Sequence, residues 1–211
     1  MQTFDLNTIK QWERFYRANF INSLTGFKSA SLIGTYHTSG IANLGVFSNI
    51  VHIGADPALI GFINRPIAAA PHTIQNVELQ KHYTINSIHS HFIDKAHKCS
   101  AKYPETVSEF AAVGLTEQKI EGINAPFVAE SLVKYALELV EIVPIKHNGT
   151  FLVIGAVQTV LVDENLLSND GFLNLNKAST VCSLGIDGYY QPTKLARFSY
   201  AKPNTNLVKI D

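Results

Sequence analysis

The sequence has little charge and little sulfur. Only 16% of its 211 residues are Asp, Glu, Lys or Arg, whereas an average soluble domain has about 25%. The 17 basic residues balance the 17 acidic ones. Binding to phosphate backbones needs a basic excess, so we expect no nucleic-acid partner. A surface short of charge also suggests that a second copy of the chain covers part of it.

Two cysteines, Cys99 and Cys182, are too few for a disulfide framework, which is typical of a reducing, cytoplasmic location. No apolar run approaches the roughly 20 residues that span a bilayer. Residues 1–10 also lack the apolar centre of a signal peptide. We therefore expect a cytoplasmic protein with no membrane partner.

Several chemical signatures are missing as well. The sequence has no G-x-G-x-x-G after a strand, no G-x-x-x-x-G-K-[ST] phosphate loop and no G-x-S-x-G nucleophile elbow. Four histidines and Cys99 come closest to a metal cluster. However, His89 and His91 are two positions apart, so they do not form the i, i+4 pair of a helical metal site. We expect no metal site, no catalytic acid–base pair and no built-in dinucleotide-binding unit.

The apolar pattern predicts a mainly β chain with short helices. Residues 132–143 alternate with a period of two, and His147-Asn148-Gly149 predicts a hairpin turn into a second long strand over residues 151–162. The remaining expected strands cover residues 30–36, 41–50, 58–64 and 82–86, and the expected helices cover residues 7–20, 71–79, 87–98 and 105–113, with another short helix after Phe172. About six strands with short helices indicate a closed or nearly closed antiparallel barrel.

Polar residues concentrate between Gly40 and Thr73. Asn43, Ser48 and Asn49 lie among apolar residues in an extended segment, and Arg65 ends a strand shortly before His72 and Thr73 open a helix. An arginine beside a helix N-terminus is a sound phosphate site, because it joins a fork of donors to free amides and a favourable dipole. The alternative is that the polar side chains serve turns and that Arg65 pairs with a carboxylate.

The order of short motifs along the chain resembles the flavin reductase-like family of FMN-binding split-barrel proteins. The similar segments are Asn43 to Asn49, Asp56 to Ile60, Asn64-Arg65-Pro66 with His72, Thr73 and Asn76, Tyr83 to Asn86, Gly149 to Val157, and Gly185 to Tyr190. Two segments depart from the family pattern. His147-Asn148-Gly149 stands where many members have Gly-Asp-His, and Ile67 to Ala70 replaces more polar residues near the phosphate.

The resemblance implies a six-stranded antiparallel split β-barrel with Greek-key topology and peripheral helices. It would comprise an N-terminal helical arm over residues 1–24, the FMN-binding barrel over 25–195 and a C-terminal tail over 196–211. The implied cofactor-binding residues are Asn43, Leu44, Gly45, Val46, Phe47, Ser48, Asn64, Arg65, His72, Thr73, Asn86 and Tyr190. In this scheme the segment from Asn43 to Ser48 holds the flavin ring and ribityl chain, and Arg65 and Thr73 take the phosphate. Asn86 braces the site, and Tyr189 or Tyr190 covers the ring.

The function implied is that of an FMN-binding oxidoreductase, a flavin reductase that passes hydride from NADH or NADPH to FMN. Its expected partners are a second copy of the chain, with the flavin at the dimer interface, and a small-molecule electron acceptor or a partner flavoenzyme. Two alternatives stay open because a fold does not dictate an activity. One is a non-catalytic flavin-binding or flavin-delivery protein, and the other is a small β-barrel interaction module without a cofactor.

Overall fold

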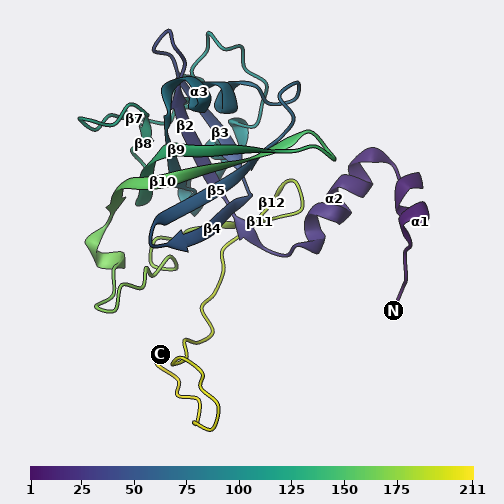
Figure 1. Ribbon diagram of the computed structural model, residues 1–211, viewed down its shortest axis with the longest axis vertical. Coiled ribbons are helices and arrows are strands. Elements are labelled where there is room, and N and C mark those ends of the chain that lie inside the picture. The colour runs from purple at the N-terminus through teal and green to yellow at the C-terminus, as the bar shows by residue number, and fades with distance from the viewer.

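The computed structural model describes residues 1–211. Its centre is a curved antiparallel sheet of seven strands, with helices and two extended terminal segments around it (Figure 1). The strands of this sheet are β2 (Ser31–Tyr36), β3 (Ala42–Phe47), β4 (Ile50–Ala55), β5 (Ala58–Asn64), β6 (His82–Ser87), β9 (Val133–Ile145) and β10 (Thr150–Val162). Two small sheets are formed by β1 (Lys28–Ser29), β11 (Cys182–Leu184) and β12 (Gly188–Tyr190), and by β7 (Glu117–Gln118) and β8 (Phe127–Val128).

The helices are short. They are α1 (Leu6–Gln11), α2 (Arg14–Leu24), α3 (His72–Gln80), α4 (Ile93–Lys98) and α5 (Glu109–Val113), with 3-10 turns η1 (Ser90–Phe92) and η2 (Glu164–Leu166). None of them is both long enough and apolar enough to cross a membrane.

The barrel is open along one line. The strand order is β3-β2-β6-β9-β10-β5-β4, so its two edge strands, β3 and β4, are neighbours in the sequence but are not hydrogen-bonded to each other. Only Ser48 and Asn49 separate them. The barrel is therefore split between two consecutive strands.

The main sheet has seven strands, whereas the sequence pattern predicts six. The pattern suggests one extended segment over residues 41–50, but the chain turns at Ser48 and Asn49 and continues as β4. The link is only two residues long and uncharged residues flank it. The pattern of apolar residues therefore does not reveal the break. The long hairpin of β9 and β10 is confirmed, and Gly149 takes the positive φ of 71° that its turn requires.

The barrel interior is an apolar cluster centred on Phe62, Tyr83, Leu137 and Val153. Tyr83 extends from β6 to Gly155 on β10, where an added Cβ would lie 2.9 Å from its Cζ atom. The hydroxyl of Tyr83 is buried and has no hydrogen-bond partner. Gly155 is thus the residue that leaves room for the tyrosine ring inside the barrel.

A second apolar cluster lies on the other face of β2 and β3. It joins Leu32 and Leu44 to Phe92, to Phe110 and to Cys99. Burial raises the pKa of the Cys99 thiol to about 12, so this cysteine is a packing residue rather than a thiolate. The cluster attaches the segment from η1 to α5 to the barrel.

Several helix predictions need correction. The expected helix over residues 7–20 is two helices, because Glu13 accepts hydrogen bonds from the amides of Phe15 and Tyr16 and so begins α2 anew. The helix expected over 87–98 is a 3-10 turn followed by α4, and α5 is limited to five residues. No helix follows Phe172, where the chain forms turns before β11.

The outer face of β4, β5 and β10 is uncovered. These three adjacent strands contain no Asp, Glu, Lys or Arg, and no helix crosses in front of them in Figure 1. Val51 and Ile53 on β4 are each 43% exposed, and the Cβ position of Gly61 lies beside Ile53 and Leu152. The long strand β10 is therefore uncharged on both faces, and one chain covers only its inner face.

Candidate functional site

A chain of hydrogen-bonded polar residues joins β2, β3 and α3. The Asn43 amide donates to the hydroxyl oxygens of Thr35 and Thr73, both at 3.3 Å, and the Asn76 amide donates to Thr35 at 3.0 Å. Thr35, Thr73 and Asn76 are buried. No acceptor in the chain takes the hydroxyl hydrogen of Thr73. The cluster therefore fixes α3 against the barrel and leaves Thr73 able to donate to a ligand.

The alternation of β3 divides the predicted flavin segment between two faces. Asn43, Gly45 and Phe47 lie on the α3 side, where a Cβ on Gly45 would be 3.2 Å from the Thr73 hydroxyl. Leu44 and Val46 pack into the second apolar cluster instead. A ligand beside Thr73 would meet only the first set of side chains.

A buried carboxylate closes the free edge of β3. Glu109, the first residue of α5, accepts a hydrogen bond from the Leu44 amide at 2.9 Å. Burial raises the pKa of Glu109, while the Leu44 hydrogen bond and the nearby His72 oppose that rise. The Leu44 amide is consequently not available to a ligand.

Asn64 determines the shape of the loop before α3. Its side-chain amide donates to the carbonyl oxygens of Arg65 at 2.7 Å and of Ala70 at 3.1 Å. Both ends of the loop are therefore held at one nitrogen atom, and Arg65 is brought near the start of α3. The Asn64 side chain is buried, and its oxygen has no partner in the chain.

The N-terminus of α3 has free donors. Pro71 precedes it without a side-chain cap, the first turn holds no acidic residue, and the amides of His72, Thr73 and Ile74 have no acceptor. Arg65 is exposed and forms no ion pair. Uncapped amides, the helix dipole and an unpaired guanidinium together favour an anion at this place.

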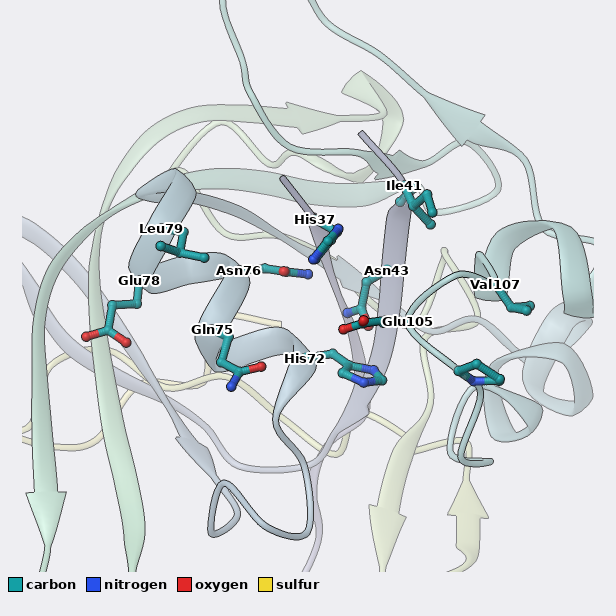
Figure 2. Close-up of a pocket in the computed structure, with 12 residues that line it drawn as sticks. His37, Ile41, Asn43, His72, Gln75, Asn76, Glu78, Leu79, Glu105 and Val107 are labelled. Atoms are coloured by element: carbon teal, nitrogen blue, oxygen red, sulfur yellow. The ribbon is translucent and has the colours of Figure 1, made fainter. Parts of the chain in front are cut away.

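A cavity of about 220 Å³ opens between α3, the start of β3 and residues 104–107. Its walls include His37, Ile41, Asn43 and His72. Figure 2 shows the carboxylate of Glu105 pointing toward Asn43. The volume is below the roughly 300–1,000 Å³ of pockets for drug-sized ligands, so it suits a single ring system better than a whole dinucleotide.

Three predicted residues lie apart from this group. Asn86 is fully buried, and its amide and oxygen bond to Leu32, Thr84 and the amide of Val128. Tyr190 lies on β12 against Phe27, and Ser48 donates to its neighbour Asn49. Asn86 thus braces the barrel with no polar atom left over, and the structure shows no contact between Tyr190 or Ser48 and the Asn43–Thr73 cluster.

Sequence reasoning missed Thr35, Glu105 and Glu109. The contacts of Thr35 with Asn76 and of Glu109 with Leu44 join residues 41 and 65 positions apart. The contact of Thr35 with Asn43 crosses from β2 to β3 over eight positions. No local pattern marks these residues as part of a site. Asn76, the other cluster residue outside the predicted site, could be found from the sequence. It follows Thr73 by three positions and therefore lies on the same side of α3.

Comparisons with known proteins show the family and the fold of the chain. The model of the flavin reductase like domain matches residues 28–184. A candidate flavin reductase with a split-barrel domain from Shewanella frigidimarina is 44% identical; 95% of this chain and 100% of that chain are covered, with a TM-score of 0.92.

More distant structures share the fold. Flavoredoxin of Desulfovibrio vulgaris is 24% identical, with 85% of this chain and 92% of that one covered and a TM-score of 0.71. An FMN-binding protein from Thermus thermophilus is 18% identical, with 83% and 90% covered and a TM-score of 0.67. Together with the match over residues 28–184, these results show that the chain belongs to the flavin reductase-like family of split-barrel proteins.

Proposed function

We propose that the protein binds FMN and acts as an NAD(P)H-dependent flavin reductase. The observation that carries this proposal is the uncapped N-terminus of α3 beside the unpaired Arg65. A phosphate there would receive backbone amides, the Thr73 hydroxyl and a charge-assisted fork from Arg65. The donors available on this chain therefore fit the phosphate end of FMN.

The flavin ring would lie beside Asn43 at the start of β3, because the Phe47 ring and Thr73 already fill the space over Gly45. Asn43 already bonds Thr73, so the residue beside the ring and the residue on the phosphate are held in one network. Bound flavin supplies the hydride chemistry, and the protein supplies position, electrostatics and access.

The 220 Å³ cavity is the proposed entry for the ring of the second reactant. It adjoins Asn43 and His72, and its volume matches a nicotinamide-sized ring rather than the whole cofactor. The remainder of NADH or NADPH would stay outside in solvent. Transient binding of this kind needs no dinucleotide-binding fold.

The proposal includes a homodimer. The uncharged outer face of β4, β5 and β10 has no cover within one chain, and surfaces of this kind mark interaction sites. In a twofold dimer, this face of each copy would be buried against an apolar surface of the other copy. The second copy would also cover a flavin that a single chain leaves exposed to solvent.

The absorption spectrum of the purified protein tests the proposed function. We expect flavin bands, either as isolated or after incubation with FMN, and loss of the band near 450 nm when NADH or NADPH is added anaerobically. Retained flavin that neither nucleotide reduces would contradict the reductase and favour a flavin carrier. A protein that takes up no FMN would contradict both.

A further inference from the structure

The first 24 residues form an arm that packs mainly on itself. Phe4, Trp12, Tyr16 and Phe20 make edge-to-face contacts, with ring centroids 4.9 to 5.9 Å apart, and these hold α1 against α2. Neither helix buries a residue. Past the segment that directly follows it, the arm has one hydrogen bond to the rest of the chain, from the Ile186 amide to the Asn19 side chain at 3.3 Å.

One side of α2 is an apolar stripe. Tyr16, Phe20 and Leu24 are spaced by four residues, and Ile21 lies beside them. Tyr16 is 61% exposed and Leu24 is 65% exposed. Two helices of 6 and 11 residues are marginal in water by themselves. Trp12 and Phe4 cover part of the stripe within the arm. Leu24, Ile21 and the exposed part of Tyr16 still need a surface to cover them.

Most of the arm falls within the likeness to a relative of known structure. The likeness to the Shewanella protein includes 95% of this chain, which leaves about 11 residues unmatched. More than half of the 24-residue arm therefore lies within the part of the chain that matches a protein of known structure. In Figure 1 both helices lie beside the barrel and leave the faces of its strands free.

The outer face of β4, β5 and β10 is the complementary surface. It is free of charge, whereas the exposed Glu138 and Glu141 lie next to it on β9, paired with Ala156 and Ile154. On the arm, Arg17 lies on the side of the stripe, and its guanidinium donates to the carbonyl oxygens of Lys10 and Trp12. Arg14 packs instead over the Phe15 ring, away from the stripe. An apolar stripe that carries the positive charge of Arg17 is complementary to an apolar face beside two glutamates.

We propose that the arm of each copy docks on the outer face of β4, β5 and β10 of a second copy. Both surfaces belong to one chain, and a twofold exchange covers both of them twice. The inference rests on the proposed dimer and adds the segment that secures it. It does not depend on flavin binding.

Two substitutions of matched exposure on one helix test the docking. Leu24 is 65% exposed and Phe15 is 66% exposed, and the nine positions between them place the two side chains on opposite sides of α2. We expect Leu24→Glu, and likewise Tyr16→Glu, to weaken self-association at least tenfold by sedimentation velocity. Val51→Glu on the receiving face should do the same, whereas Phe15→Glu should leave it unchanged.

Cross-linking identifies the copy that receives the arm. In a Cys182→Ser background, the Leu24→Cys/Val51→Cys chain treated with a short bismaleimide should migrate as a dimer on a denaturing gel. Phe15→Cys/Val51→Cys should cross-link several-fold less. A Leu24→Cys/Val51→Cys product of monomer size would show that the arm folds onto its own chain.

The outcomes separate the two proposals. A wild-type monomer at micromolar concentration would overturn the dimer and this inference together. A wild-type dimer that Leu24→Glu, Tyr16→Glu and Val51→Glu leave intact would overturn the docking of the arm alone. Flavin uptake by the same samples reports on the proposed function independently.

Discussion

Arg65 is the residue on which the phosphate assignment depends. Its guanidinium has no ion-pair partner in the chain, and Asn64 holds its backbone near Ala70, just before the free amides of α3. We expect Arg65→Ala to weaken FMN binding about ten- to a hundredfold, since a charge-assisted contact is worth roughly 1.5–3 kcal/mol. Riboflavin, which has no phosphate, should bind both proteins equally in fluorescence-quenching titrations.

Arg65→Lys is the conservative control. An ammonium cannot reproduce the bidentate fork, so we expect it to restore only part of the affinity. Equal weakening of FMN and riboflavin by Arg65→Ala would remove this residue from the phosphate site. Unchanged binding of both would leave the phosphate to Thr73 and the amides beside it.

His89 gives the protein an acid-sensitive contact. Its Nε2 atom accepts from the Leu132 amide at 2.9 Å, and its Nδ1 atom lies 3.2 Å from the Thr180 hydroxyl, so the folded protein holds the neutral ring. Burial, with a smaller effect of His91, lowers the pKa of His89 from 6.5 to about 4. Its stabilisation is therefore complete above pH 6.5 and is lost as the pH falls toward 4.

Urea denaturation between pH 7.5 and 4.5 measures this effect. In wild type, His89 should make the unfolding free energy fall by up to about 1.4 kcal/mol for each pH unit between pH 6.5 and 4. His89→Gln should abolish this contribution. The exposed His91→Gln is the matched control and should retain most of it. The same pH dependence in wild type and His89→Gln would disprove the assignment.

Part of the residue-level site could be predicted from the sequence. Arg65, His72 and Thr73 are close in the chain, and a strand end followed by a helix start is a local pattern. Thr35 is 41 positions from its hydrogen-bond partner Asn76, and Glu109 is 65 positions from its partner Leu44. Contacts over such separations are created by the fold, so no local pattern could show them.

At the scale of elements, the packing of β6 against β10 across the barrel depends on Gly155. A methyl group there would collide with the hydroxyl and the Cζ atom of Tyr83. We expect Gly155→Ala to lower the unfolding free energy by about 1–3 kcal/mol, as overpacking does in other cores. Chemical denaturation followed by circular dichroism measures the change.

Tyr83→Phe is the companion variant. It removes a buried hydroxyl that has no partner, so by itself it should be neutral or stabilising. In the Gly155→Ala background it should recover part of the lost stability, because one of the colliding atoms is gone. Additive effects of the two substitutions would contradict the proposed contact.

The elements differ in how well the sequence specifies them. The β9–β10 hairpin carries both a strand period and an Asn-Gly turn, and its position follows from the two together. β4 carries neither: Ile50 to Ala55 does not alternate, and only Ser48 and Asn49 separate it from β3. The division of the N-terminal helix depends on the Glu13 cap, which a helical period does not distinguish from a continuous helix.

For the whole molecule, we expect a dimer in solution. Two chains of 23.2 kDa give a mass of about 46 kDa by light scattering at micromolar concentration. Burial of the uncharged outer strands is the physical reason, and Ile154→Lys on that face should shift the mass toward one chain. A mass near 23 kDa for the wild-type protein would contradict the dimer.

The low charge of the sequence, together with the absence of charged residues from the long strand over residues 151–162, indicates that such an uncovered surface exists. The sequence does not indicate which segment covers it, because the position of the arm relative to the barrel follows from tertiary structure. The same limit applies to the split in the barrel. A strand list does not say which pair of strands stays unbonded.

The aromatic cluster of the arm makes the protein its own optical probe. Trp12 is the only tryptophan in the chain, and it is packed among Phe4, Tyr16 and Phe20. Fluorescence excited at the long-wavelength edge of the tryptophan absorption band therefore originates in the arm alone. No added label is needed. The wavelength and anisotropy of this emission will follow the environment of residues 1–24 while the barrel is spectroscopically silent. Flavin absorbs in the range of this emission, so quenching on FMN addition would also report the separation between the arm and the cofactor.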